Sequence, residues 1–256
     1  MREAGLEQAI AAAGGVSALS RALGLSQPTV SNWRRIPSER VLAAEAATGV
    51  SRSVLRPDLY PEAREPLDDV EAARAGLYRL LAALLAAAPK RALLGQVARL
   101  RGDGSPLGMA QAALAEAAAR ADADDVEREY FDLFIGVGRG ELLPYGSYYM
   151  SGFLNDRPLA RLRADLATLG IERAAPVGDP EDHAAHLCEV MAGLASGDFP
   201  ATGDQQRSFF ERHLAPWAGR FFGELAINPR AVFYRPVADL GGLFMDIETQ
   251  AFALEG

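Results

Sequence analysis

The chain has 256 residues, of which 49% are hydrophobic, a share typical of a globular protein. Its single cysteine, Cys188, excludes an internal disulfide and every zinc motif built on paired cysteines, and favours a reducing compartment such as the cytoplasm. The formal net charge is −8, but residues 1–61 carry seven arginines against five acidic residues while the remainder is strongly acidic, which is typical of two domains with different partners.

No stretch of the sequence is expected to cross a membrane or to act as a secretory signal. The longest apolar run, residues 80–88, is about half of the ~20 residues that a membrane-spanning helix needs. Near the N-terminus, Glu3 and Glu7 interrupt a short alanine-rich stretch, and no apolar core with a cleavage site follows. We therefore expect a cytoplasmic protein without a membrane span.

Residues 1–56 have the pattern of a helix-turn-helix domain. A first helix is expected from Ala4 to Ala13, and a further one from Ser38 to Thr48. Between them, apolar residues are spaced so that two short helices pack at an angle around Gly24. These residues are Leu19, Leu23, Leu25, Val30 and Trp33. Ser26 is placed to cap the second short helix, with Pro28 in its first turn.

The second short helix carries polar side chains on its expected outer face. They are Gln27, Thr29, Ser31 and Asn32, followed by Arg34 and Arg35. Amide and hydroxyl groups can hydrogen-bond to base edges, and arginines can neutralise phosphates. The segment resembles the Cro-like repressors and their YdaS-type relatives, which implies DNA binding, with a dimer to supply enough positive charge. The alternative is a helical hairpin that has kept this fold without binding DNA.

Three prolines within ten residues predict a linker over residues 57–66, because a residue before proline is disfavoured in a helix. Both flanking parts show helical periodicity and almost no strand alternation. The expected fold class is therefore all-α, with a small helix-turn-helix domain followed by a larger helical bundle over residues 67–256.

The larger part is expected to begin with a long helix whose apolar stripe runs from Val70 to Leu85 and which ends by Pro89. Asp122, with two more acids behind it, marks the start of a later helix. The further expected helices are Arg91–Leu100, Leu107–Arg120, Ala123–Ile135, Pro158–Leu169, Pro180–Ala195, Gln205–Ala226 and Arg230–Ala253.

Three motifs in this part carry a family resemblance. They are YFDLF at residues 130–134, PYGSYY at 144–149 and DPEDH at 179–183. The sequence over about residues 70–254 resembles the TorD/DmsD family of chaperones for twin-arginine signals, in which the last motif usually reads Glu-Pro-x-Asp-His. Asp179 replaces the usual glutamate, and Gly146 stands where relatives often carry glutamate, so one acidic contact is absent.

The resemblance implies a chaperone, not an enzyme, that needs no cofactor. Its partners would be a twin-arginine signal peptide and the apo-form of a molybdenum-cofactor oxidoreductase, with formate dehydrogenase suggested as the client, and it could form a homodimer. A signal of two cations and an apolar stretch needs acids beside aromatic walls. The implied peptide-binding residues are Tyr130, Phe134, Pro144, Tyr145, Ser147, Tyr149, Asp179, Asp182 and His183.

Other interpretations of these residues remain open. About half of the aromatic side chains are expected to be core, and Asp182 with His183 could simply form a hydrogen bond that fixes a helix start. Helical spacing of Asp182, His183, His186 and Glu189 makes a metal site conceivable, but the motifs of di-iron bundles and HExxH are absent and no metal is expected. The alternative function is a one-component transcription regulator whose bundle acts as a sensor or dimerisation module.

Overall fold

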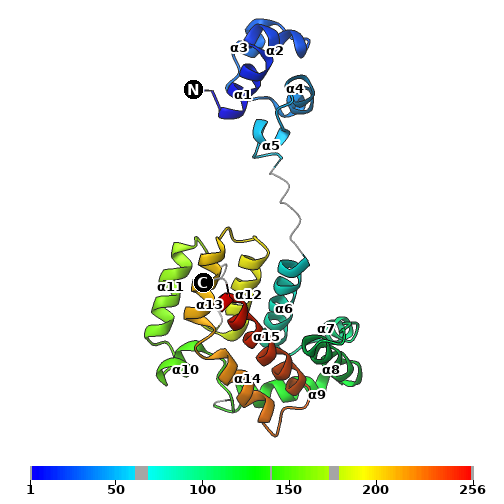
Figure 1. The fold of residues 1–256 in the computed structure, drawn as a ribbon, viewed down its shortest axis with the longest axis vertical. Coiled ribbons are helices and arrows are strands. Elements are labelled where there is room, and N and C mark those ends of the chain that lie inside the picture. The colour runs from blue at the N-terminus through cyan, green and yellow to red at the C-terminus, as the bar shows by residue number, and fades with distance from the viewer. Residues whose placement is uncertain (1, 61–68, 139, 173–178, 255–256) are drawn as a thin grey trace. The chain divides into compact units, whose positions relative to one another are not determined.

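The computed structural model describes residues 2–60, 69–138, 140–172 and 179–254. The chain forms two compact units, residues 1–66 and 67–256 (Figure 1). Within the described residues all regular structure is helical, apart from one isolated β-bridge between Tyr145 and His183. The all-α prediction is therefore confirmed. Most of the predicted linker, residues 61–66, lies outside the described residues.

The first unit is a small helical domain. Its elements are α1 Ala4–Ala13, α2 Val16–Ala22, α3 Gln27–Ser31, η1 Ser38–Arg40, α4 Val41–Thr48 and α5 Arg52–Leu55. Gly14 ends α1 with a φ of 82°, and Gly24 makes the turn between α2 and α3 with a φ of 65°, both in the left-handed region that glycine adopts freely.

The predicted packing of the two short helices is present. Leu19, Leu23 and Val30 are buried in one cluster, and Leu25 and Trp33 pack against it. The Ser26 hydroxyl accepts a hydrogen bond from the Thr29 backbone N–H at 3.4 Å, which is the expected cap. The helix that it starts is short and ends at Ser31, so the two arginines that were expected at its end lie in the following turn.

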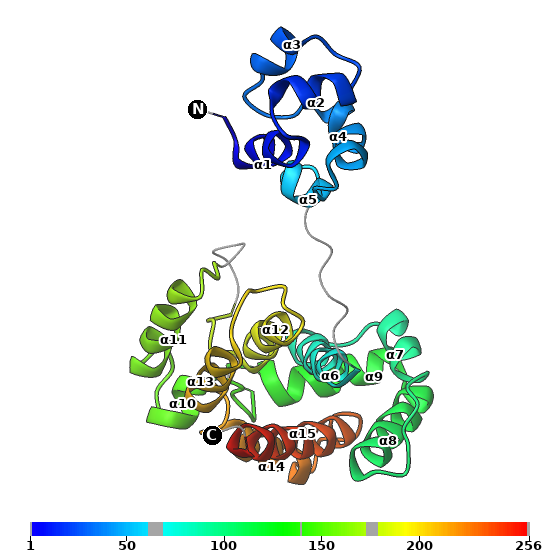
Figure 2. The ribbon, with the colours of Figure 1, turned by 45° about the horizontal axis from the view of Figure 1, so that its top comes forward.

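The second unit is a larger helical bundle. Its elements are α6 Asp69–Ala86, α7 Arg91–Val97, α8 Pro106–Arg120, α9 Ala123–Tyr130, η2 Phe131–Ile135, α10 Gly146–Ser151, α11 Arg157–Thr168, α12 Ala184–Ala195, α13 Gly203–His213, α14 Ala218–Ile227 and α15 Tyr234–Leu254. Figure 2 shows α12 beside α6 and α14 beside α15, and these two pairs share the most extensive contacts of the unit. Its largest fully buried side chains include Trp217, Tyr78, Tyr234, Phe210 and Phe221.

Two helix predictions were wrong in their extent. The helix expected over Gln205–Ala226 is two helices, α13 and α14, because Pro216 disfavours helical backbone at the residue before it. The helix expected to start at Pro180 starts at Ala184, since residues 180–183 form a turn and a bridge instead.

Three further helices differ from those predicted. The helix α10, which contains most of the PYGSYY motif, was not among the helices expected from the sequence. The expected helix over Ala123–Ile135 changes to π-helical geometry at Phe131. The last helix begins at Tyr234, four residues late, because the Glu129 carboxylate accepts the backbone N–H groups of residues 232, 233 and 234 at 2.8 to 2.9 Å.

Candidate functional site

The motifs PYGSYY and DPEDH, which are separated in sequence by some thirty residues, lie against each other in the fold. The Gly146 N–H donates to the Asp182 carbonyl at 2.9 Å, and the Ala184 N–H donates to the Pro144 carbonyl at 2.8 Å. This antiparallel bridge joins the start of α10 to the start of α12. We call the residues of the two motifs, 144–149 and 179–183, the motif junction.

Asp182 stabilises the motif junction from within. Its Oδ2 atom accepts a hydrogen bond from the Ser147 N–H at 2.7 Å, and its side chain is 3% exposed. The carboxylate thus satisfies a backbone donor at the start of α10, where the helix dipole also favours a negative charge. Its Oδ1 and the Ser147 hydroxyl have no hydrogen-bond partner within the described part of the chain. Asp182 and Ser147 therefore face the interior.

His183 caps the next helix. Its Nδ1 accepts a hydrogen bond from the Ala185 N–H at 3.1 Å, and its ring meets the Tyr145 ring edge to face at 5.0 Å. Burial is the main cause that lowers the pKa of His183 to about 4, while the charge of Asp179 acts in the opposite direction. The ring is therefore neutral at neutral pH. The hydrogen bond that fixes a helix start, one of the two interpretations of the Asp182–His183 pair, is present.

This burial predicts a pH dependence of stability. The pKa of His183 is about 4 in the folded protein and 6.5 for a histidine exposed to water. The contribution of neutral His183 to stability is therefore complete above pH 6.5 and is lost as the pH falls towards 4. The free energy of unfolding should decrease by roughly 3 kcal/mol from this group over that window. His183→Asn keeps an acceptor at the cap but does not titrate, so urea unfolding at several pH values should show a shallower decline. An equal decline in both proteins would contradict the prediction.

Asp179 is the accessible carboxylate of the motif junction. Its Oδ1 accepts a hydrogen bond from the Tyr145 hydroxyl at 2.7 Å, and its side chain is exposed. Burial and this bond to Asp179 both raise the pKa of Tyr145. Burial, and then the charge of Asp179, raise the pKa of Tyr130 to about 12. Asp179, Tyr145 and Tyr130 are thus held close together at the surface.

The aromatic side chains divide between core and surface. Phe134 is 8% exposed and Tyr149 is 7% exposed. The Tyr149 ring stacks on Trp217 at 5.3 Å, and its hydroxyl donates to Glu224 at 2.7 Å. Pro144 is also buried. Tyr130, Tyr145 and Tyr148 are half-buried, and Phe153 is 71% exposed.

The packing of Gly146 explains one departure from the family motif. A Cβ atom at this position would lie 3.1 Å from Trp217 Nε1, which is closer than most real Cβ contacts. The indole N–H already donates to the His213 carbonyl at 2.6 Å and is fixed there. A larger side chain at residue 146 would therefore have to displace Trp217.

The metal geometry considered from sequence does not form. Asp182 and His183 precede α12, so they do not share a helix face with His186 and Glu189. The His186 Nδ1 atom lies 3.0 Å from the Pro180 carbonyl. Among the residues that the structure describes, no cluster of metal-ligating side chains is found.

In the first unit, the side chains predicted to contact DNA are all exposed. They are Gln27, Thr29, Ser31, Asn32, Arg34 and Arg35. Arg35 lies 3.8 Å from Asp58, which offsets part of its charge. Sequence reasoning missed Arg2, whose guanidinium donates to the Ser31 carbonyl at 3.0 Å and so lies at the end of α3. Only the folded contact between the N-terminus and α3 reveals that position.

Each unit matches a family model over part of the chain. The family model described as nitrate reductase delta subunit matches residues 101–223, and the one described as bacterial toxin YdaS matches residues 6–64. No helix in the described ranges combines the length and apolar character needed to cross a membrane.

Individual relatives match each unit. The chaperone protein TorD of Vibrio cholerae El Tor Inaba N16961 is 30% identical over 106 residues, which are 38% of this chain and 48% of that protein, and TorD of strain M66-2 gives the same values. The chain thus spans about half the length of these relatives. YdaS of Escherichia coli K12, a candidate transcriptional regulator, is 46% identical over 59 residues, 21% of this chain and 60% of that protein.

Among solved structures, a candidate redox enzyme maturation protein from Archaeoglobus fulgidus aligns with a TM-score of 0.47 and 17% identity, over 72% of this chain and 99% of that one. The family matches and the relatives agree with the resemblance carried by the sequence motifs. The larger unit is thus similar to TorD chaperones and to the nitrate reductase delta subunit family, and the first unit is similar to the YdaS family.

Proposed function

We propose that the protein is a cytoplasmic chaperone that binds a twin-arginine signal peptide and the apo-form of a molybdenum-cofactor oxidoreductase until the cofactor is inserted. Formate dehydrogenase is the proposed client. The observation that carries the proposal is the motif junction, where the two family motifs meet and leave the Asp179 carboxylate exposed beside Tyr145. The relatives of this unit named as TorD chaperones support it.

The chemistry of the motif junction suits an arginine-bearing peptide. A carboxylate held by a tyrosine hydroxyl has a fixed orientation, and a guanidinium can pair with a carboxylate through two parallel hydrogen bonds. Tyr145 and Tyr130 provide half-buried aromatic surface next to it. The buried members of the predicted set would act indirectly, since Asp182, Ser147 and His183 hold the two helix starts in register.

The test is binding of synthetic peptides to the full-length protein, followed by fluorescence anisotropy. One peptide carries two adjacent arginines before a Leu/Ala stretch, and the control carries two lysines instead. We expect arginine-dependent binding, because an ammonium group cannot pair in two places with one carboxylate. Absence of binding to any such peptide would refute the chaperone function.

DNA binding is a second proposed function, carried by the first unit. The six polar and cationic side chains on and after α3 are exposed together, and this unit matches the YdaS family. Two copies reading two half-sites would supply the positive charge that one domain lacks, so we propose that the protein binds DNA as a homodimer. If DNA binds and no peptide does, the protein is instead a one-component regulator.

A gel shift at low salt against the protein's own promoter region tests this function. The double variant Gln27→Ala/Asn32→Ala should lose the shift, because both side chains are exposed at α3. The matched control is Gln8→Ala, which removes an exposed amide from α1. A shift that survives the double variant would exclude α3 as the reading helix.

A further inference from the structure

The N-terminal segment of the first unit lies against the turn that follows α3. The Arg2 guanidinium donates a hydrogen bond to the Ser31 carbonyl at 3.0 Å, and the Glu3 N–H donates to the Arg34 carbonyl at 2.7 Å. Ser31 is the last residue of α3, so these two bonds hold the segment alongside the end of the helix that we propose to read DNA. Arg2 therefore lies next to residues that are about thirty positions away in sequence.

Arg2 joins two other cations at this end of α3. Arg34 and Arg35 are exposed, and Arg2 is half-buried. We call Arg2, Arg34 and Arg35 the α3 arginine group. Among the described residues, neither Arg2 nor Arg34 forms an ion pair, and Arg35 only approaches Asp58, at 3.8 Å. The α3 arginine group thus keeps most of its positive charge.

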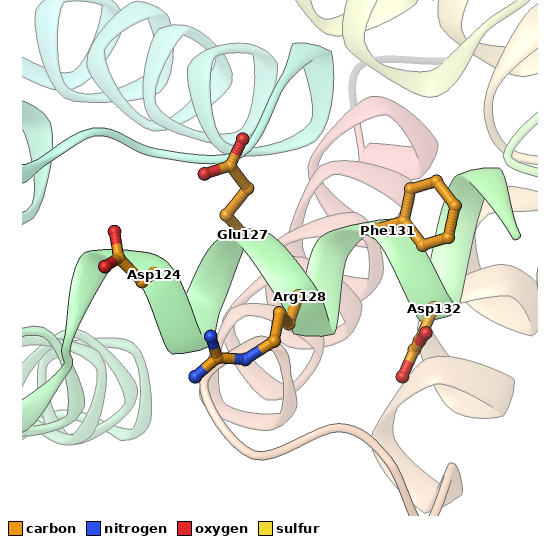
Figure 3. A pocket seen from close by; sticks show the side chains of 5 residues that line it. All are labelled: Asp124, Glu127, Arg128, Phe131 and Asp132. Atoms are coloured by element: carbon orange, nitrogen blue, oxygen red, sulfur yellow. The ribbon is translucent and has the colours of Figure 1, made fainter.

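Several other arginines of the chain have their charge offset by acids. In the first unit, Arg52 pairs with Glu45 at 2.9 Å. In the larger unit, Arg128 lines a surface hollow on α9 (Figure 3) and pairs with Asp125. Such cations have a partner within the fold. The charge of Arg2 is instead available to an anion from outside the protein.

The hydrogen bond to Ser31 orients the Arg2 side chain and leaves most of its donors free. A guanidinium has several N–H groups, and the Ser31 carbonyl accepts only one, from Nη2. The remaining donors of an oriented guanidinium can form two parallel hydrogen bonds with the oxygens of a phosphate. The same bond satisfies a carbonyl at the end of α3 that has no partner within so short a helix. Arg2 thus caps α3 and presents a cation beside it.

We propose that Arg2 binds a phosphate group of the DNA backbone beside the end of α3, so that the N-terminal segment forms part of the DNA interface. This inference rests on the DNA binding proposed for the first unit, and it adds a contact that lies outside the helix-turn-helix motif. Charge complementarity selects the occupant, since duplex DNA presents a regular row of anions to the α3 arginine group. A phosphate contact positions a protein on DNA and carries no sequence information. Arg2 should therefore add affinity for every DNA sequence alike.

The experiment measures the dissociation constant of the full-length protein for two fluorescent DNA duplexes over a range of salt concentrations. One duplex comes from the protein's own promoter region, and the other has the same composition in scrambled order. Arg2→Gln should weaken binding to both duplexes and should lower the slope of log Kd against log salt by about one. The ratio of the variant's dissociation constant to that of the wild-type protein should then fall about 3- to 4-fold when salt rises about fourfold.

Two variants are controls for this change. Arg52→Gln removes the same charge from α5, where Arg52 is already paired with Glu45, and should leave the salt slope unchanged. Arg2→Lys keeps a cation that can bind a phosphate, so it should retain the wild-type slope. If Arg2→Gln fails to fold, the wild-type protein provides a second measurement. Bound DNA should slow the modification of Arg2 by phenylglyoxal and leave that of Arg52 unchanged, as followed by mass spectrometry.

The outcomes separate the two proposals. If the wild-type protein binds neither duplex, both DNA binding and the Arg2 contact are refuted. If it binds and Arg2→Gln keeps the wild-type salt slope, DNA binding stands and the phosphate contact is wrong, because Arg2 then only caps α3. A loss confined to the promoter duplex would also overturn the contact, since Arg2 would then read bases. A lower slope on both duplexes in Arg2→Gln, with neither control changed, supports the phosphate contact.

Discussion

Replacing Glu248 by alanine should lower the free energy of unfolding of the larger unit by about 3–5 kcal/mol. Glu248 is 1% exposed and accepts hydrogen bonds from two guanidinium nitrogens of Arg74 and from the Tyr78 hydroxyl, each at 2.8 Å. Arg74 is largely buried, with its guanidinium 5.0 Å from the Phe252 ring centre. Removal of Glu248 would therefore leave two nitrogens of a mostly buried guanidinium and a buried hydroxyl without their acceptor.

Urea denaturation measures this effect, and the two tryptophans allow each unit to be followed. Trp33 lies in the first unit and Trp217 in the second, so a Trp33→Phe background reports the larger unit alone. The matched control is Glu71→Ala, which removes the other acidic partner of Arg74 from a more exposed position. That change should cost at most about 1 kcal/mol. Equal losses in the two variants would show that burial of Glu248 does not set its contribution.

Glu248 also illustrates what the sequence could not reveal about the fold. The apolar periodicity of the long helices was readable from the chain, and both ends of α1 and the last residue of α8 were predicted correctly. Nothing in the periodicity identifies an acid in the last helix as the partner of an arginine 174 residues earlier. Such pairs depend on which helices become neighbours, and here α6 and α15 pack together.

Two helix starts that the sequence did not predict have a common physical cause. The start of α15 depends on Glu129, and the start of α10 depends on Asp182, each a carboxylate from a distant segment that accepts backbone N–H groups. Local patterns predict caps only when the capping side chain is next to the helix, as Ser26 is for α3. Caps supplied through tertiary contacts leave no such local signal.

The sequence predicted which residues lie at the candidate site better than it predicted how they are arranged there. The motif resemblance selected residues that the fold does bring together, with Tyr145 against both Asp179 and His183. Which of them face solvent was not predictable, because the burial of Asp182 follows from the contact between the two motifs, and the burial of Tyr149 follows from its packing against Trp217 and Phe221. The exposure of the residues proposed to contact DNA was easier to predict, since a short helix with one apolar side has only one side left to expose.

Asp182 is buried and Asp179 is exposed, so we expect their replacement to have different effects on stability. Asp182→Ala should lower the free energy of unfolding by roughly 2–3 kcal/mol, because the buried Ser147 N–H loses a charged acceptor at 2.7 Å. The start of α10 should then lose its register with α12, and the affinity for the di-arginine peptide should fall as well. Urea denaturation and peptide anisotropy on the same preparation measure the two effects.

Asp179→Ala is the matched variant, since it removes an equal carboxylate from the exposed side of the motif junction. Its stability should stay within about 0.5 kcal/mol of wild type, while the dissociation constant for the di-arginine peptide rises about 3- to 10-fold. A stable Asp179→Ala protein with wild-type affinity would show that this acid does not contact the peptide. Loss of affinity in both variants, with loss of stability in Asp182→Ala alone, would mean that one aspartate binds the peptide while the other builds the surface on which it binds.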